Sequence, residues 1–386
     1  MEDNMTIRLY DQDAQLMTFT ARVIACEEKK GQYAVTLDRT AFFPEGGGQG
    51  ADHGLLGGVH VVDCHEVHGE VVHTTDGPLT PGSEVRGEVD AVRRLDMMQQ
   101  HSGEHIFSGL VHSHFGYDNV GFHIGSDAVT MDFNGPLTDE DVRMIEREAN
   151  AIIWKNIPVV TLLPSPDELK AMTYRSKKEL EGTVRIVTIE GADTCACCGT
   201  HVRLTGSIGQ IKALSCQKYK SGVRVSILCG RRALEEETLQ QEQLRRAAVA
   251  LSAKQHEAGE AVERVLAERD HLRWQNEQLG LRIFDLMAQA EAERDVRVVA
   301  CDALTPGALR KAAGKLCQGA RLGLVLLARE DGWSFALSSQ TEDVRPATRA
   351  LCEAFGGKGG GPKDMTQGVL ARGGAEEIRA LLASIG

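Results

Sequence analysis

A long helical stretch without proline constrains this chain most, because it divides the sequence into two parts. Residues 232 to about 292 are rich in Glu, Gln, Arg, Ala and Leu and contain no proline. Apolar residues recur there at every seventh position: Leu244, Leu251, Ala258, Val265, Leu272, Leu279 and Leu286. This spacing predicts a coiled-coil seam. Gly259 could mark the bend of a helical hairpin, so one long helix and two antiparallel helices both remain open.

The patterns on either side of this linker predict an α+β chain of four parts. Residues 1–90 carry short β-branched runs joined by glycine-rich turns, which indicates a small N-terminal β-barrel. Residues 91–230 mix helical and strand patterns, as an α+β domain does. Residues 231–294 form the helical coiled-coil linker. In residues 295–386 strands alternate with helical stretches, which indicates a C-terminal α/β domain.

Two helices of the second part can be placed closely. The run RRLDMMQQHSGEHIFSGLVHSHF, residues 93–115, has helical spacing and no breaker except Gly103. Thr138 precedes three acidic residues, which predicts the start of a helix. That helix should end before Pro158.

The composition excludes several classes of protein. The formal net charge of −12 argues against nonspecific wrapping of nucleic acid. Residues 296–386 nevertheless hold 12 Lys+Arg and 9 Asp+Glu, a net of +3, so a polyanion would dock most easily there. The acidic N-terminus does not resemble a signal peptide, and no segment is apolar enough for a membrane, so we expect a cytoplasmic protein with reduced cysteines.

Two pairs of residues have the spacing of metal ligands. His101 and His105 are four residues apart in HSGEH, which places both imidazoles on one face of a helix. Cys197 and His201 have the same spacing in CACCGTH, a glycine-containing stretch that we expect to be a loop. Each pair alone is a weak signal, but together they favour one tetrahedral Zn²⁺ bound by three nitrogens and one sulfur. Glu104 is at the wrong position for the HExxH motif of zinc proteases, and we expect it to be solvated.

HSGEH together with CCGTHV resembles the editing domain shared by alanyl-tRNA synthetases and their free-standing AlaX relatives. Three further stretches are similar to that domain: TAFFPEGGGQGADHG, GFHIGSDAVTMDF and THVRLTGSIGQIKALS. The resemblance runs through most of residues 7 to 230. It implies zinc-dependent hydrolysis of the ester that joins serine to alanine tRNA. Since no aminoacylation core precedes residue 1, we expect no charging activity.

The resemblance also implies roles for residues of the substrate pocket. Thr40 is expected to bind the serine hydroxyl, which an alanine-sized pocket rejects only weakly. Gln49 is expected near the scissile ester. Gly46, Gly47 and Gly48 would let the backbone approach the acceptor end closely.

The C-terminal part adds a second resemblance. FGGKGGGPKDMTQG is similar to the glycine-rich signature of the DHH-associated domain, which implies tRNA contacts by a loop that includes Lys358, Gly359 and Gly360. The architecture resembles the long form of AlaX, and the coiled coil and C-terminal domain would support a homodimer. Two alternatives remain: a tRNA-binding module with purely structural zinc, and a deacylase of another charged tRNA, such as alanine tRNA carrying glycine.

Overall fold

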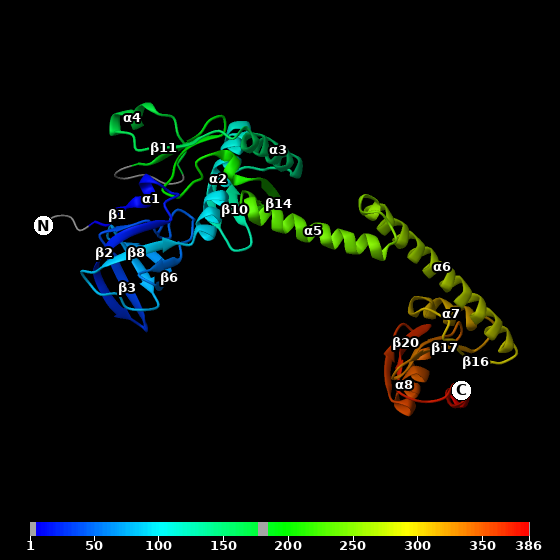
Figure 1. Ribbon diagram of the computed structural model, residues 1–386. Coiled ribbons are helices and arrows are strands. Elements are labelled where there is room, and N and C mark those ends of the chain that lie inside the picture. The colour runs from blue at the N-terminus through cyan, green and yellow to red at the C-terminus, as the bar shows by residue number, and fades with distance from the viewer. Residues whose placement is uncertain (1–4, 177–183, 386) are drawn as a thin grey trace. The chain divides into compact units, whose positions relative to one another are not determined.

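The computed structural model describes residues 5–176 and 184–385. The chain forms two compact units, Met1–Gln243 and Leu244–Gly386 (Figure 1). Both contain separate sheets and helices, so the α+β class predicted from the sequence is confirmed. No helix among the described residues has the length and apolar character needed to cross a membrane.

The first unit begins with a closed barrel whose strands follow the order β2-β3-β7-β6-β5-β8. These strands are β2 (Thr18–Lys29), β3 (Gln32–Leu37), β5 (Gly54–Leu56), β6 (Val59–Val67), β7 (Glu70–Thr75) and β8 (Glu84–Val89). The alternating burial of β8 matches the period-two pattern of its sequence, with Val85, Gly87 and Val89 turned inward. The short elements β1 (Ile7–Arg8), α1 (Leu9–Gln12) and β4 (Arg39–Thr40) precede or follow barrel strands.

A long helix, α2 (Ala91–Phe115), joins the barrel to the rest of the unit. It begins where Asp90 accepts hydrogen bonds from the backbone amides of Val92 and Arg93, and it ends at Gly116 in the left-handed region. The helix predicted over 93–115 is therefore confirmed. From Met97 to Val111 nearly every residue of α2 is buried, whether apolar or polar. This burial brings polar side chains into the interior.

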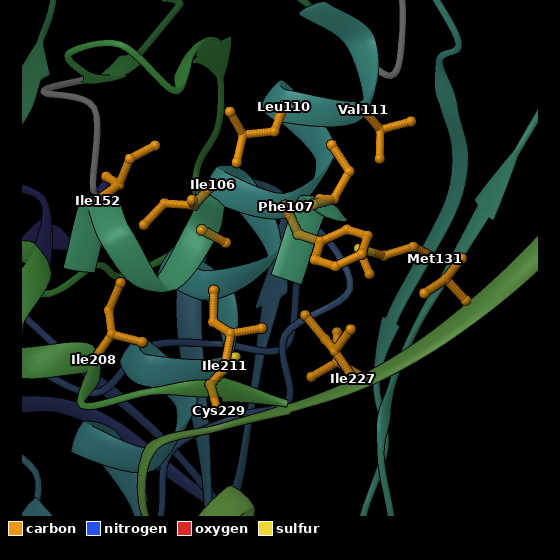
Figure 2. Packing of buried hydrophobic residues seen from close by; sticks show 14 of the residues in the cluster. Ile106, Phe107, Leu110, Val111, Met131, Ile152, Ile208, Ile211, Ile227 and Cys229 are labelled. Carbon is orange, nitrogen blue, oxygen red and sulfur yellow. The ribbon is translucent and has the colours of Figure 1, made fainter. Parts of the chain in front are cut away.

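The core of the first unit lies around α2. One sheet has the order β14-β15-β10-β9, with strands β9 (Asn119–Ile124), β10 (Val129–Phe133), β14 (Ile211–Tyr219) and β15 (Gly222–Cys229). Ile106 and Phe107 of α2 pack in one cluster with Met131 of β10 and Ile227 of β15 (Figure 2). Helix α3 (Asp139–Lys155) also contributes to this cluster. It begins after Thr138, as predicted, and Thr138 and Asp141 form a capping box there.

A second sheet precedes the loop that contains Cys197 and His201. Its order is β11-β12-β13, with strands β11 (Val159–Leu162), β12 (Ile186–Ile189) and β13 (Asp193–Ala196). The short helix α4 (Pro166–Ala171) lies between β11 and β12 in the sequence, and η1 (Thr205–Ile208) follows β13. Residues 197–204 follow β13 without regular helix or strand, so the loop predicted for CACCGTH is confirmed from Cys197 on, while Cys195 and Ala196 end the strand.

The linker is two helices rather than one. Helix α5 (Gly230–Ala250) ends at a Schellman-type cap, in which Ser252 has φ 51° and the Ala253 amide donates to Ala248 O at 2.9 Å. After the short η2 (Gln255–Glu257), helix α6 (Ala258–Ala290) resumes. The alternative of one continuous helix is wrong. The interruption precedes Gly259, which lies in the first turn of α6.

The second unit has a mixed five-stranded sheet with the order β16-β17-β18-β20-β19. Its strands are β16 (Val296–Ala300), β17 (Leu322–Arg329), β18 (Gly332–Ser338), β19 (Gly357–Gly360) and β20 (Met365–Leu370). Its other elements are η3 (Pro306–Ala308), α7 (Leu309–Leu316), α8 (Val344–Phe355) and α9 (Ala375–Ser384). Only β16 and β17 pair in parallel among its described strands. Buried residues of the sheet and helices form two apolar clusters.

Candidate metal centre

The two predicted ligand pairs meet inside the first unit. His101 and His105 lie one turn apart on α2, with ring centroids 5.3 Å apart. The loop after β13 brings Cys197 and His201 to them, and one ligand atom from each of the four residues lies within 4.8 Å of all the others. The three histidines are at most 4% exposed. These four residues are called the metal cluster below.

Each imidazole of the metal cluster has its Nδ1 held by a side chain. His105 Nδ1 lies 2.9 Å from Asp193 Oδ2, and His101 Nδ1 lies 2.9 Å from Gln49 Oε1. His201 Nδ1 lies 3.1 Å from Ser102 Oγ. Carboxylate and amide oxygens only accept hydrogen bonds, so His101 and His105 donate from Nδ1. When these two rings are neutral, this assignment leaves a lone pair on Nε2 for a metal.

The electrostatics of the metal cluster favour a bound cation. Burial alone would raise the pKa of the Cys197 thiol, but the neighbouring histidines lower it well below its ordinary value. Burial alone would lower the pKa of His105, but the Cys197 thiolate and the hydrogen bond to Asp193 raise it to about 10. Burial lowers the pKa of His201 to about 3. The thiolate form of Cys197 therefore favours a positive charge beside it, which a bound cation would supply.

The distances between donor atoms fit zinc. Cys197 Sγ lies 3.3 Å from His101 Nε2 and 3.4 Å from His201 Nε2. Tetrahedral zinc with bonds of roughly 2.0 Å to nitrogen and 2.3 Å to sulfur places such atoms about 3.5 Å apart. The donor set and its spacing therefore suit Zn²⁺.

Two glycines make room for this centre. A Cβ atom at Gly199 would collide with the His101 ring, and one at Gly48 would collide with Phe122. The Phe122 ring itself lies 5.1 Å from that of His101. Gly48 has φ +84° and its carbonyl accepts from the Ile124 amide at 2.9 Å. The GGGQ segment is thus fixed beside the centre rather than free at the surface.

Gln49 is the link between this segment and the metal cluster. Besides His101 Nδ1, its Oε1 accepts from the Thr200 amide at 3.1 Å, and its Nε2 donates to Thr200 Oγ1 at 2.9 Å. Gly46 and Gln49 bond to each other through their backbones, and Gly47 has φ 59°. The turn formed by Gly46, Gly47 and Gly48 therefore sets where the Gln49 side chain enters the centre.

Thr40 lies in the barrel interior and is completely buried. Its Oγ1 lies 2.8 Å from His73 Nε2 and accepts from the Phe42 amide at 3.1 Å. His73 Nδ1 lies 3.1 Å from the Val35 carbonyl, which can only accept, so Nδ1 carries the proton. Burial lowers the pKa of His73 to about 4, which keeps the ring neutral. Thr40 therefore donates to His73, and one acceptor position remains on its hydroxyl.

Several residues of the centre were not anticipated from the sequence. Glu104, which we expected to be solvated, is fully buried and accepts from Ser108 Oγ at 2.6 Å and Asn119 Nδ2 at 2.7 Å. Asp193 also binds Arg175 at 2.8 Å. Arg185 holds the ligand loop, donating from Nη1 to the carbonyls of Cys197 and Gly199. The strand pattern of TVRIVTIEG gave no sign of this contact.

The glycine-rich segment of the second unit is not the loop that was predicted. Lys358, Gly359 and Gly360 lie in β19, an edge strand that pairs with β20, and all three are exposed. A Cβ atom at Gly359 would meet the Phe335 ring and the Gln367 carbonyl, so close packing of the strand requires glycine there.

Comparisons with known proteins bear on this site. Residues 184–225, which include Cys197 and His201, match the family described as the threonyl and alanyl tRNA synthetase second additional domain. The alanyl-tRNA editing protein AlaX-L of Pyrococcus horikoshii is 32% identical over 244 residues, 60% of this chain and 60% of that protein. The editing protein Aarsd1 of Bos taurus is 34% identical over 241 residues, 58% of this chain and 54% of its own. The chain is homologous to the AlaX-type alanyl-tRNA editing proteins.

The similarity also extends beyond the editing proteins. The alanine–tRNA ligase of Methanopyrus kandleri is 31% identical over 389 residues, which cover 94% of this chain and 42% of the ligase. The chain spans 42 to 60% of the length of these relatives. Among solved structures, RecJ from Thermus thermophilus matches with 16% identity and a TM-score of 0.26, covering 40% of this chain and 30% of RecJ.

Proposed function

We propose that the chain is a trans-editing hydrolase that removes serine from alanine tRNA by cleaving the aminoacyl ester at the tRNA 3′ end. The observation that supports this most is the metal cluster, in which Asp193, Gln49 and Ser102 each orient one imidazole. The homology to alanyl-tRNA editing proteins supports the choice of substrate. Such a protein would act in the cytoplasm on tRNA that a separate enzyme has charged.

The proposed cofactor is one Zn²⁺ per chain, bound by His101, His105, Cys197 and His201. Bound zinc supplies a Lewis acid that polarises a carbonyl or a water when a coordination position is open, and a rigid structural centre when none is. Four protein donors lie within reach of one ion. This is the observation that favours the second candidate, a tRNA-binding module whose zinc only holds the fold.

In the proposed reaction, Thr40 selects the amino acid. The Thr40 hydroxyl already donates its proton to His73, so toward a ligand it can only accept a hydrogen bond. The serine hydroxyl can donate to this position, whereas alanine and glycine have no donor in their side chains. A site that pairs with a hydroxyl disfavours a substrate that lacks it.

Gln49 and the glycine turn would position the ester. Gln49 holds His101 and Thr200 together, so it fixes the ligand ring and the loop at once. We assign Gly46, Gly47 and Gly48 the role of letting the backbone lie against the acceptor end. Both roles place the amino acid between the barrel and the metal cluster.

The second unit is proposed to hold the tRNA at a distance from the reaction. The proposed domains are a barrel at residues 1–90 and an editing part at residues 91–230. A linker at residues 231–294 would then lead to a DHH-associated tRNA-binding domain at residues 295–386. Lys358 with Gly359 and Gly360 would contact the tRNA backbone. The exposed seam residues Val265, Leu272, Leu279 and Leu286 of α6 support a homodimer through the linker and C-terminal domain.

The test is hydrolysis of alanine tRNA charged with serine, glycine or alanine by the full-length protein. We expect serine to be released fastest and alanine slowest. Faster release of glycine would assign the protein to the other deacylase class. Tight binding of the charged tRNA without release of any amino acid would favour the binding module.

A further inference from the structure

Arg232 joins three elements of the first unit at the base of the linker. Helix α5 begins at Gly230, directly after β15, and Arg232 lies in its first turn. Its Nε lies 2.9 Å from both carboxylate oxygens of Asp96 on α2, and its Nη2 lies 2.6 Å from Asp96 Oδ2. Its Nη1 donates to the carbonyls of Gly125 at 2.7 Å and Ser126 at 3.3 Å, in the turn between β9 and β10. One guanidinium therefore holds α5, α2 and this turn together.

The contact with α2 leads towards the metal cluster. Asp96 also accepts from Gln100 Nε2 at 3.2 Å, and Gln100 is the fully buried residue before His101. The Gln100 side chain exchanges two hydrogen bonds of 2.8 Å with the backbone of Cys229 at the end of β15. A Cβ atom at Gly103 would collide with Cys229 Sγ, so α2 and β15 are in close contact here. The turn of α2 that carries His101 is thus fixed to the strand from which α5 continues.

The contact with the β9–β10 turn leads to the glycine segment. Gly125 follows Ile124, whose amide donates to the Gly48 carbonyl at 2.9 Å. Two residues earlier in β9, Phe122 packs on Gly48, and its ring lies 5.1 Å from that of His101. Arg232 therefore holds the end of a strand that contacts both the glycine turn and one ligand of the metal cluster.

The ion pair of Arg232 differs from the exposed pairs of the chain. The side chains of Arg232 and Asp96 are 15% and 7% exposed. Exposed pairs contribute little because water screens them, whereas removing one partner of a buried pair leaves a charge uncompensated. Within the described residues, Arg232 hydrogen-bonds to none of the four ligands of the metal cluster. Its effect on the metal cluster must therefore pass through α2 and β9.

We propose that Arg232 is a positioning residue for the hydrolysis, because it fixes α2 and the end of β9 in one arrangement and so sets the metal cluster against the glycine turn. The inference rests on the proposed function for the reaction that it serves. A misplacement of reacting groups by about 1 Å can lower a rate by about 100-fold, even when the change is distant from the chemistry. Affinity for tRNA would depend on contacts made elsewhere, so loss of Arg232 should lower kcat more than it raises KM.

The experiment measures kcat and KM for serine release from alanine tRNA, zinc per chain and the urea midpoint of full-length variants. We expect Arg232→Gln to lower kcat at least about tenfold, with KM within about twofold and zinc retained. Arg232→Lys keeps the charge but cannot make the paired bonds, so it should recover only part of the rate. Asp96→Asn should lower kcat similarly. The double variant should be no slower than the slower single variant, because both changes remove the same contact.

Arg224→Gln is the matched control. Arg224 on β15 also forms a paired bond with an aspartate, Asp132, at 2.6 and 2.8 Å, and neither residue belongs to α2 or to the β9–β10 turn. Equal losses of kcat in Arg232→Gln and Arg224→Gln would overturn the positioning role. Additive losses in the double variant would overturn it too, as would a lower urea midpoint with unchanged kcat.

Hydrogen exchange of the same variants gives a measurement that does not depend on turnover. Residues 91–100 and 119–124 should both exchange faster in Arg232→Gln than in Arg224→Gln, since the first change releases α2 and β9 together. A wild type that releases no serine would refute the proposed function. The exchange measurement would then decide alone whether Arg232 fixes both elements, and unchanged exchange in either one would overturn the inference.

Discussion

Three imidazoles at the metal centre each have one nitrogen committed to the protein, which leaves the other for a metal. Asp193 is the strongest of these partners, because it holds His105 and is itself held by Arg175. Residues that orient metal ligands contribute roughly 10- to 100-fold to metal affinity. We therefore expect Asp193→Asn to weaken zinc binding by about that factor, measured by competition with a chromophoric chelator. Asp132→Asn, which breaks the ion pair with Arg224 elsewhere, is the control, and an equal loss there would refute the role of Asp193.

His73 makes a pH-dependent contribution to stability. Its pKa is about 4 in the folded chain, against an ordinary value of about 6.5, because burial disfavours the charged ring. As the pH falls below about 6.5 the unfolded chain takes up this proton first, so stability is lost down to about pH 4. The loss is about 3 kcal/mol. The difference in free energy of unfolding between wild type and His73→Gln should shrink by that amount from pH 7 to 4 in urea titrations, and a constant difference would contradict the assignment.

At the scale of elements, α2 depends on a buried ion pair at its start. Arg94 and Asp52 are both fully buried, and Arg94 also donates to the carbonyls of Ala14 and Ala41. Removing one partner of such a pair leaves the other charge uncompensated, at a cost of about 3–5 kcal/mol. Arg94→Met should destabilise the first unit by that amount in urea unfolding. Arg86→Met, at an exposed pair with Glu88, should cost under about 1 kcal/mol, and similar losses for both would refute this account.

The same helix shows what the sequence could and could not predict. The spacing of His101 and His105 is local, so the helical period alone places both rings on one face. Gln49 meets His101 across 52 residues, and Asp193 meets His105 across 88. No local pattern encodes such contacts, because they depend on how the barrel and the β13 sheet pack against α2. Glu104 was misjudged for the same reason: α2 is buried on all sides in its middle, although its sequence is polar there.

At the scale of the whole molecule, the chain separates into a unit that holds the metal cluster and a unit that does not, whose residues 296–386 are mildly basic. If the second unit binds tRNA, losing it removes affinity but no catalytic group. A chain truncated after Gln243 should keep its zinc and its hydrolysis, while KM for charged tRNA rises about 100-fold. Its binding should also depend less steeply on salt, since fewer phosphate contacts remain. Unchanged affinity and salt dependence would show that the second unit serves something other than tRNA.

The central claim is that His101, His105, Cys197 and His201 hold the zinc on which hydrolysis depends. The most direct measurement counts zinc per chain by elemental analysis and, on the same samples, the rate of serine release from alanine tRNA. We predict about one zinc in the wild type. In the Cys197→Ala, His201→Ala double variant we predict loss of both the metal and the activity. Full zinc occupancy in the double variant, or undiminished serine release from metal-free protein, would contradict the account.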